Sequence, residues 1–357
     1  MRTFKSIRRT FLYLFLISLT LNSFAQNKEL PNVVILATGG TIAGTAEGGN
    51  QAGYTAGQLG IHTMIDAAPG IKKLANITGE QISNVGSQDM TIDIWLNLAT
   101  KVNTLLASND VDGIVITHGT DTQEETAYFL SLVVKSDKPV VTTGAMRPAT
   151  ALSAEGPLNL YNAVAVAANP ASIGHGVTVV MNDQIHAAHE VTKVSTTAVQ
   201  SFMSPVEGQI GSVLYGEVEY FRKPYSIHTT KSEFSVKGVK ALPRVDIIYA
   251  YTNMPADLVQ HSIDAGAKGI VIAGVGNGNM NNETLQAVKK ATDKGIIVVR
   301  STKVPLGDVL RNAEVNDDEY NTIASDELNP AKARVLLMLT LLKERDLTEI
   351  QQLFFDY

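Results

Sequence analysis

The sequence contains no cysteine among its 357 residues. No disulfide can form, and the same absence excludes catalysis by a thiol and metal binding by thiolates. Aromatic residues are also scarce, at 6% of the chain, whereas hydrophobic residues make up 45%. We therefore expect aliphatic side chains to dominate a large core, and the chain length favours about two domains.

Positive charge is in the minority, since 29 Lys and Arg residues stand against 35 Asp and Glu residues and give a formal net charge of -6. No basic stripe of the kind that binds a phosphate backbone is present, so we expect no nucleic-acid partner. The sequence also lacks low-complexity tracts and short-period repeats. These features together indicate an acidic globular protein.

The N-terminus departs from this overall composition. Four basic residues precede an apolar run from Phe11 to Leu21, and Ser23-Phe24-Ala25 follows it. This order predicts a secretory signal peptide over residues 1–25, because the run is shorter than the roughly 20 residues that a membrane-spanning helix needs. Its removal would change the formal charge from -6 to -10. We expect a periplasmic protein without a membrane anchor, and the Arg8-Arg9 pair leaves general and twin-arginine export both open.

Apolar strand patterns alternate with helical patterns along most of the chain, which predicts an α/β fold with crossover helices. The first series has strands at 33–38, 80–86, 113–118, 139–144 and 177–182, and helices at 60–75, 91–107, 123–134 and 155–168. The second has strands at 245–249, 269–273 and 296–299, and helices at 255–265, 283–293 and 331–345, the first two of which precede Gly266 and Gly295 as left-handed caps. We expect a larger domain at 26–222 with a mainly parallel, flavodoxin-like sheet, a linker at 223–243 after irregular β structure, and a smaller α/β domain at 244–357.

Two of these strands run into glycine-threonine turns, Gly39-Gly40-Thr41 and Gly119-Thr120. Because open α/β sheets bind ligands at the carboxyl ends of their strands, we expect both threonines in one crevice. The first turn is not a dinucleotide-binding loop, since Thr41 occupies the place of the second glycine and no G-K-[ST] follows. A glycine-rich segment at 44–60 predicts a mobile lid, with Tyr54 closing over substrate or, alternatively, simply exposed.

A threonine hydroxyl needs a proton acceptor within hydrogen-bonding reach before it can act as a nucleophile. We expect a structural role for His118, which faces away from its strand neighbours, and no metal at His186 and His189, whose spacing with Glu190 matches no zinc motif. Lys193, which stands among hydroxyl-bearing and apolar residues in the sequence, is the remaining candidate, since burial favours a neutral amine; an exposed surface lysine is the alternative. Asp121, at a helix start, is either part of the same group or only an N-cap.

The motifs ATGGTIAG from Ala37 and HGTDT from His118 are specific when they occur in this order. With them, the chain resembles the bacterial L-asparaginase family, and in particular its exported type II enzymes. Further matching segments are GEQISNVGSQDM from Gly79, KPVVTTGAMRP from Lys138, VTKVSTT from Val191, AGVGNGN from Ala273 and LNPAKARVLL from Leu328.

The resemblance implies a role for each matching residue. Thr41 matches the nucleophile and Tyr54 its lid partner, and a second catalytic group matches Thr120, Asp121 and Lys193. Substrate-binding residues match Ser87, Gln88, Thr120, Asp121, Asn279 and Glu314. Asn279 and Glu314 would come from a neighbouring subunit of a homotetramer built as a dimer of intimate dimers. No cofactor and no metal is implied.

These roles suit an amino-acid amide, because hydroxyl and N–H donors bind its α-carboxylate while carboxylates bind its α-ammonium group. Attack by Thr41 on the side-chain carbonyl of L-asparagine would give an acyl-enzyme and ammonia, and water would then release aspartate. A glutaminase-asparaginase of broad specificity is the alternative within this class, since one methylene is worth only about 1 to 3 kcal/mol. A periplasmic amino-acid-binding protein, which needs no such catalytic set, is the alternative from another class.

Overall fold

Short runs of buried, mostly aliphatic residues form the central parallel strands of an eight-stranded sheet, in the order β10-β9-β6-β5-β4-β3-β1-β2. The structure, a computed structural model, describes residues 29–46 and 55–357. The parallel strands are β1 (Asn32–Gly39), β2 (Asn76–Val85), β3 (Gly113–Thr117), β4 (Val140–Thr143) and β5 (Val177–Met181). The antiparallel extension consists of β6 (Gln184–Ala187), β9 (Gly211–Leu214) and β10 (Glu217–Tyr220).

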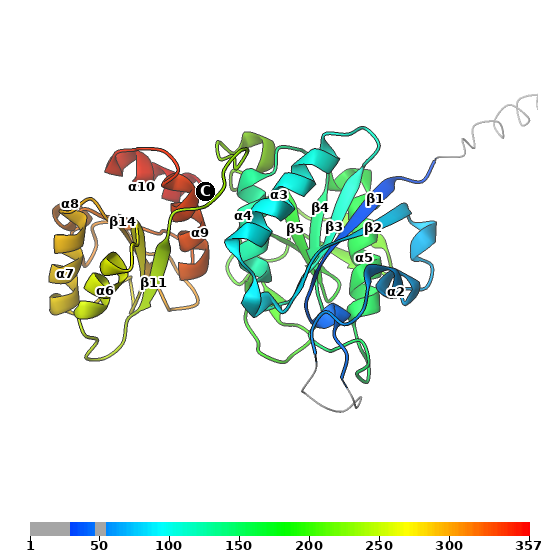
Figure 1. The fold of residues 1–357 in the computed structure, drawn as a ribbon, viewed down its shortest axis with the longest axis horizontal. Coiled ribbons are helices and arrows are strands. Elements are labelled where there is room, and N and C mark those ends of the chain that lie inside the picture. The colour runs from blue at the N-terminus through cyan, green and yellow to red at the C-terminus, as the bar shows by residue number, and fades with distance from the viewer. Residues whose placement is uncertain (1–28, 47–54) are drawn as a thin grey trace, which may run out of the picture. The chain divides into compact units, whose positions relative to one another are not determined.

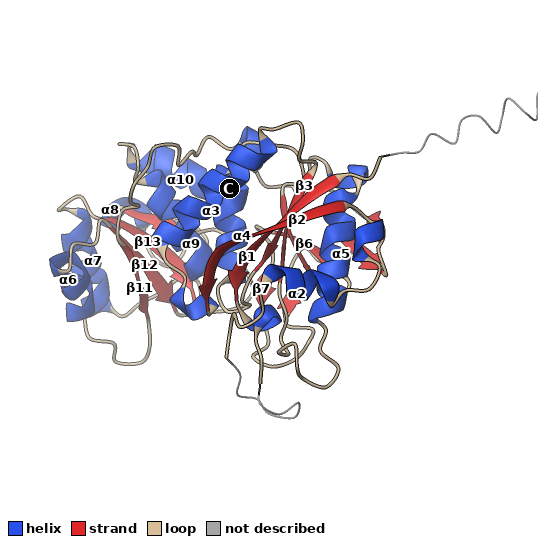
Figure 2. Ribbon diagram, turned by 45° about the vertical axis from the view of Figure 1, so that its right-hand side comes forward, coloured by secondary structure: helices blue, strands red, loops and turns tan. Residues whose placement is uncertain are grey.

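Helices cover both faces of this sheet, which is why β3, β4 and β5 are buried at every position rather than at alternate ones. They are α2 (Ile61–Asp66), α3 (Ile92–Leu106), α4 (Gln123–Val133) and α5 (Gly156–Ala168). Along β1, Val34 and Leu36 belong to the core under α3 and α4, whereas Val33 and Ile35 belong to the core under α2 and α5. Figure 1 and Figure 2 show the two pairs of helices on opposite sides of the strands.

A second sheet, in the order β11-β12-β13-β14, is parallel throughout. Its strands are β11 (Val245–Tyr249), β12 (Gly269–Gly274), β13 (Ile297–Thr302) and β14 (Thr322–Ala324). The helices around it are α6 (Asp257–Asp264), α7 (Asn282–Thr292), α8 (Asp317–Tyr320), α9 (Pro330–Thr340) and α10 (Leu347–Asp356). A separate two-stranded ribbon pairs β7 (Thr192–Lys193) with β8 (Phe202–Met203).

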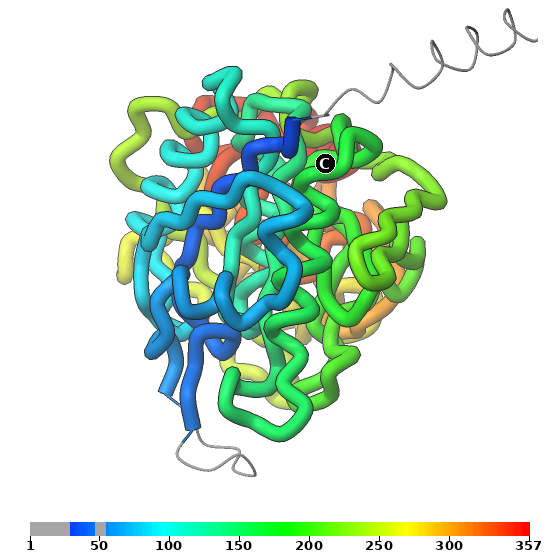
Figure 3. The backbone as a smooth tube through the Cα atoms, turned by 90° about the vertical axis from the view of Figure 1, so that its right-hand side faces the viewer, coloured from blue at the N-terminus to red at the C-terminus, as the bar shows by residue number. Residues whose placement is uncertain are grey.

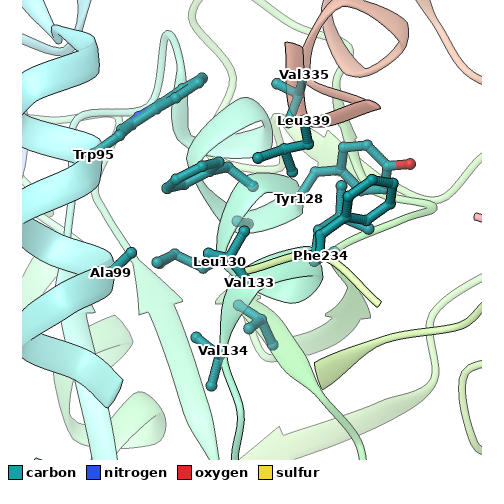
Figure 4. Packing of buried hydrophobic residues seen from close by; sticks show 14 of the residues in the cluster. Trp95, Ala99, Tyr128, Leu130, Val133, Val134, Phe234, Val335 and Leu339 are labelled. Carbon is teal, nitrogen blue, oxygen red and sulfur yellow. The ribbon is translucent and has the colours of Figure 1, made fainter. Parts of the chain in front are cut away.

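One continuous core joins the two sheets through α4 and α9, and residues 31–357 form one compact unit. Figure 4 shows Tyr128 of α4 beside Val335 and Leu339 of α9, with Phe234 next to Tyr128. The Tyr128 hydroxyl donates to the backbone oxygen of Tyr357 at 2.7 Å. The C-terminal helix is thereby tied to the large sheet.

The expected α/β architecture, with a large mainly parallel sheet and a small one, is confirmed. The expected left-handed caps are also confirmed, with φ of 91° at Gly266 and 82° at Gly295. The expected helix at 60–75 is wrong in extent: α2 ends at Asp66, and Gly70 takes φ 81° just after Pro69, which lacks an N–H donor. Within the described residues, no helix is both long and apolar enough to cross a membrane.

Candidate active site

The two glycine-threonine turns lie against each other at one edge of the large sheet. β1 pairs with β3 in parallel, with Ala37 opposite Thr117, so both strands end side by side. Gly40 has φ 82°, and a Cβ there would lie 2.3 Å from the backbone nitrogen of Gly119. Only glycine at residue 40 therefore allows the turns to approach this closely. Thr41, 4% exposed, opens the short 3-10 turn Thr41–Ala43 that follows.

His118 directly precedes the second turn, hydrogen-bonds to it and is completely buried. Its Nδ1 lies 2.7 Å from the carbonyl oxygen of Gly119, which can only accept, so this nitrogen carries the proton. Nε2 then accepts from the Thr126 hydroxyl at 2.9 Å, and that hydroxyl accepts from Trp95 Nε1 at 2.8 Å. Burial lowers the pKa of His118 to about 4, so the ring is neutral at pH 7. The structural role expected for this histidine agrees with these contacts.

Four of the candidate residues form one hydrogen-bonded group around Thr120. Lys193 Nζ donates to Thr120 Oγ1 at 2.9 Å and to Asp121 Oδ1 at 2.7 Å. The backbone N–H of Asp121 donates to Ser87 Oγ at 3.0 Å, and the Thr122 hydroxyl donates to the backbone oxygen of Ser87 at 2.8 Å. The group thus joins the loop after β2, the turn after β3 and strand β7.

The surroundings of Lys193 and Asp121 settle two points that the residue pattern left open. Asp121 does not cap α4, because Thr122 occupies the N-cap position and makes no side-chain capping bond. Lys193 does not lie in an apolar pocket, as its side chain is 17% exposed and faces the carboxylate of Asp121, which is 58% exposed. The exposed-lysine alternative is also wrong, since both Nζ contacts are to site residues.

Ser87 and Gln88 open a short 3-10 turn after β2, where Ser87 is 4% exposed and Gln88 is exposed. Ser87 Oγ already accepts one backbone N–H, which leaves its own hydroxyl proton to be donated elsewhere. Tyr54 lies outside the described residues. The two ends of the segment that contains it are paired, because Thr45 and Thr55 exchange backbone hydrogen bonds of 3.1 and 2.9 Å (Figure 3).

Asn279 and Glu314 form a second group, in loops around the small sheet, where Asn279 Nδ2 donates to Glu314 Oε2 at 2.5 Å. Within the described residues, Glu314 makes no hydrogen bond to Ser87, Thr120, Asp121 or Lys193. Glu314 is exposed, whereas the Oδ1 atom of Asn279 is buried and has no hydrogen-bond partner in that part of the chain. The structure of one chain therefore does not bring these two residues into the first group.

A buried ion pair contacts both the loop that carries Asn279 and the loop that carries Glu314. Arg300 is 1% exposed, and its Nε and Nη2 donate to the Asp317 carboxylate at 2.6 and 2.7 Å. The same guanidinium donates to the carbonyl oxygen of Asn277 at 3.0 Å and to that of Leu310 at 3.2 Å. Burial alone would raise the pKa of Asp317, but hydrogen bonds from Arg300, Thr322 and the Asn312 backbone lower it below its usual range. The pattern of residues gave no sign of this pair.

Glu124 is a further site residue that sequence reasoning missed. Its Oε2 accepts from the backbone nitrogen of Lys193 at 2.7 Å, and its Oε1 lies 3.4 Å from Asn329 Nδ2. The carboxylate in the first turn of α4 therefore fixes the main chain of the lysine that contacts Thr120. An acidic first helical turn was visible in the sequence, but its partner 69 residues away was not.

The histidines of the H-x-x-H segment have separate partners. His186 Nδ1 lies 3.0 Å from Ser204 Oγ, whereas the His189 ring packs edge-on against Tyr128 and Tyr225. Glu190 pairs with Arg222 at 2.6 Å. Among the described residues, no group of three or more His, Asp or Glu side chains is arranged to hold a metal ion.

The chain is an α/β protein with one mainly parallel and one fully parallel sheet. Hydroxyls, a lysine and a carboxylate gather where strands of the larger sheet end, and these are residue types of a hydrolase site. The chain belongs to the asparaginase family. Residues 32–226 match the family model described as asparaginase, N-terminal, and residues 244–354 match the glutaminase/asparaginase C-terminal domain.

Similar proteins agree with this assignment. The chain is 53% identical over 335 residues to a probable periplasmic L-asparaginase of Haemophilus influenzae, covering 94% of this chain and 95% of that one. It is 44% identical over 359 residues to a glutaminase-asparaginase of Pseudomonas fluorescens, covering 100% and 99%. Among solved structures, a probable cytoplasmic L-asparaginase of Campylobacter jejuni superposes with a TM-score of 0.89 at 44% identity, covering 92% and 100% of the two chains.

Proposed function

We propose that this protein hydrolyses L-asparagine to L-aspartate and ammonia. The observation that carries the proposal is the Ser87–Asp121–Lys193–Thr120 group beside the Thr41 turn, in a chain of the asparaginase family. In this proposal, the α-carboxylate of the substrate binds the hydroxyl of Ser87 and the turn at Thr120. The α-ammonium group binds Asp121, with Gln88 beside it.

Thr41 is the proposed nucleophile. Its attack on the side-chain amide carbon would form the ester bond and break the carbon–nitrogen bond, with a proton delivered to the leaving ammonia. Water would then cleave the ester and release aspartate. The backbone N–H groups of Thr41 and Thr120 are the proposed oxyanion donors, each worth about 3 kcal/mol in the barrier.

Thr120 and Lys193 are the proposed proton-transfer pair. Their 2.9 Å contact places Nζ to exchange a proton with the Thr120 hydroxyl, and Asp121 Oδ1, which accepts from Nζ at 2.7 Å, would orient the lysine side chain. Tyr54 is proposed to cover Thr41 when substrate is bound. Asn279 and Glu314 are proposed to complete the site from a neighbouring subunit of a homotetramer.

The location of the protein is part of the proposal. Residues 1–25, outside the described part of the chain, are proposed to be a signal peptide that sends the enzyme to the periplasm. The name of the Haemophilus relative supports this location, although the Campylobacter relative is named as cytoplasmic. A domain boundary within residues 223–243 is likewise proposed.

The decisive experiment incubates purified protein with L-asparagine or L-glutamine and measures ammonia. We expect rapid release from asparagine and slower release from glutamine. Equal rates would instead favour a glutaminase-asparaginase of broad specificity, and the Pseudomonas relative is named a glutaminase-asparaginase. Asparagine that binds but stays intact for hours would overturn the proposal in favour of a binding protein.

A further inference from the structure

A buried lysine of the small-sheet region contacts the main chain next to Lys193. Lys332 lies in the first turn of α9 and is 3% exposed. Its Nζ donates to the carbonyl oxygens of His189 at 2.5 Å and Val191 at 2.6 Å. Burial lowers the pKa of Lys332 to about 8, against the opposing effect of Glu124, Glu190 and Glu327. Burying an ammonium group is costly, so its two contacts have a structural reason to be maintained.

Those contacts fix the segment that leads into the site. Val191 is two residues before Lys193, and His189 lies in the turn that follows β6. The other end of the same segment is fixed by Glu124, which accepts from the backbone nitrogen of Lys193 at 2.7 Å.

The first turn of α9 reaches this second anchor as well. Asn329, the N-cap of α9, accepts from the backbone nitrogen of Lys332 at 3.0 Å, and its Nδ2 lies 3.4 Å from Glu124 Oε1. Two routes thus run from one helical turn to the backbone of Lys193. Neither route touches Ser87, Thr120 or Asp121.

We propose that Lys332 is a positioning residue for Lys193: by holding the carbonyls of residues 189 and 191, it keeps Nζ of Lys193 within hydrogen-bonding distance of Thr120 and Asp121. The inference rests on the proposed function, in which Lys193 transfers protons. Since a misplacement of about 1 Å can cost on the order of 100-fold in rate, loss of the Lys332 ammonium should lower kcat strongly. Substrate affinity depends on other side chains, so KM should change by less than about threefold.

The Lys332→Met variant tests this, with Lys138→Met as its matched control. Lys138 also donates to two backbone carbonyls, those of Ser108 at 2.6 Å and Val111 at 2.7 Å, but hydrogen-bonds to no candidate site residue that the structure describes. We expect kcat for asparagine to fall on the order of 100-fold in Lys332→Met and to stay within about threefold of the unmodified enzyme in Lys138→Met. Similar losses in both variants would show general destabilisation and overturn the inference.

Chemical rescue provides a readout that a merely structural role would not give. Because the chain has no cysteine, Lys332→Cys carries a single thiol. In denaturant, its thiolate displaces bromide from 2-bromoethylamine and forms a carbon–sulfur bond, which restores an ammonium group at nearly the length of lysine. After refolding, kcat should recover at least about tenfold over the unalkylated variant, with the unmodified enzyme taken through the same steps as reference.

Two outcomes separate this inference from the proposed function. The inference alone is overturned if the unmodified enzyme hydrolyses asparagine but the kcat of Lys332→Met is less than threefold lower. It is also overturned if aminoethylation of Lys332→Cys does not raise kcat. An unmodified enzyme that releases no ammonia overturns both. If Lys332→Met does not fold, Lys332→Gln keeps an uncharged NH2 donor group at the position, and its kcat should lie between those of the unmodified enzyme and the unalkylated Lys332→Cys variant.

Discussion

The two threonines that end neighbouring strands have different surroundings. Thr41 opens the 3-10 turn that follows β1, whereas Thr120 accepts a hydrogen bond from Lys193. The parallel pairing of β1 with β3 brings the two turns together. The hydrogen bond from Lys193 is the reason that we propose proton transfer for Thr120 and nucleophilic attack for Thr41.

Removal of either hydroxyl should therefore abolish most turnover and leave the fold intact. We expect Thr41→Ala and Thr120→Val each to lower kcat by at least about 100-fold, because each removes a group that takes part in bond making or proton transfer. Ammonia release under saturating asparagine measures the effect. Thr178→Val is the matched control, since Thr178 is 2% exposed in β5 and its hydroxyl has no partner among the described residues. A normal rate in Thr41→Ala would refute its role as nucleophile.

At the scale of elements, the loops around the small sheet depend on one buried ion pair. Arg300 of β13 contacts the backbone of both loops that carry Asn279 and Glu314, and Asp317 at the start of α8 neutralises it. An isolated buried charge is expensive, so the pair acts as a unit. The positions of Asn279 and Glu314 therefore depend on the same ion pair that stabilises this part of the chain.

Asp317→Asn should destabilise the protein more than the loss of a surface ion pair does. It leaves Arg300 buried without a counter-ion, so we expect the free energy of unfolding to fall by about 3 to 5 kcal/mol and KM for asparagine to rise. Urea unfolding and steady-state kinetics measure the two effects. The neighbouring Asp318→Asn is the control, because Asp318 pairs with Arg311 at the surface and should contribute less than about 1 kcal/mol. Equal effects from the two substitutions would contradict this account.

The elements that could be predicted from the sequence are the long, strongly patterned ones. The buried runs of β1 and β3 and the apolar stripe of α3 lie within a residue or so of their expected positions. The four-residue α8 and three-residue β14 are too short to show a periodicity, and Pro69-Gly70 divides the expected helix at 60–75. Contacts such as Glu124 with Lys193 join segments far apart in sequence, so no local pattern could have identified them.

At the scale of the whole molecule, buried histidines make stability depend on pH. Burial lowers the pKa of His118 and His186 to about 4 and, together with Lys332, that of His189 to about 3. In the unfolded chain a histidine has a pKa of about 6.5, so below this pH the unfolded state binds more protons than the folded state. The stability that these neutral rings contribute is thus complete above pH 6.5 and is lost as the pH falls towards 4.

The share of this loss that comes from His186, which lies outside the candidate site, can be measured separately. Each such histidine contributes a slope of up to about 1.4 kcal/mol per pH unit between its folded and unfolded pKa. We expect His186→Asn, which keeps a hydrogen-bonding group near Ser204, to reduce the slope by about that amount between pH 6 and 4.5. Urea unfolding at several pH values measures the slope. An unchanged slope in the variant would show that His186 titrates alike in both states.

The candidate active site either is complete within one chain or needs Glu314 from a second subunit. Within one chain, Glu314 contacts Asn279 but not the group around Thr120. If a second subunit supplies Glu314, two inactive variants should complement each other. Thr41→Ala and Glu314→Ala subunits, refolded together in equal amounts, would form mixed dimers in half of the cases, and each mixed dimer would hold one intact and one doubly altered site.

About a quarter of the activity of the unmodified enzyme should then return, measured as ammonia release per subunit. Each variant refolded alone is the control and should stay inactive. A mixture of Thr41→Ala with Thr120→Val is a second control: both changes fall in the same half of a shared site, so no mixed dimer contains an intact one. If Glu314 instead acted within its own chain, the first mixture would recover no more activity than this second one.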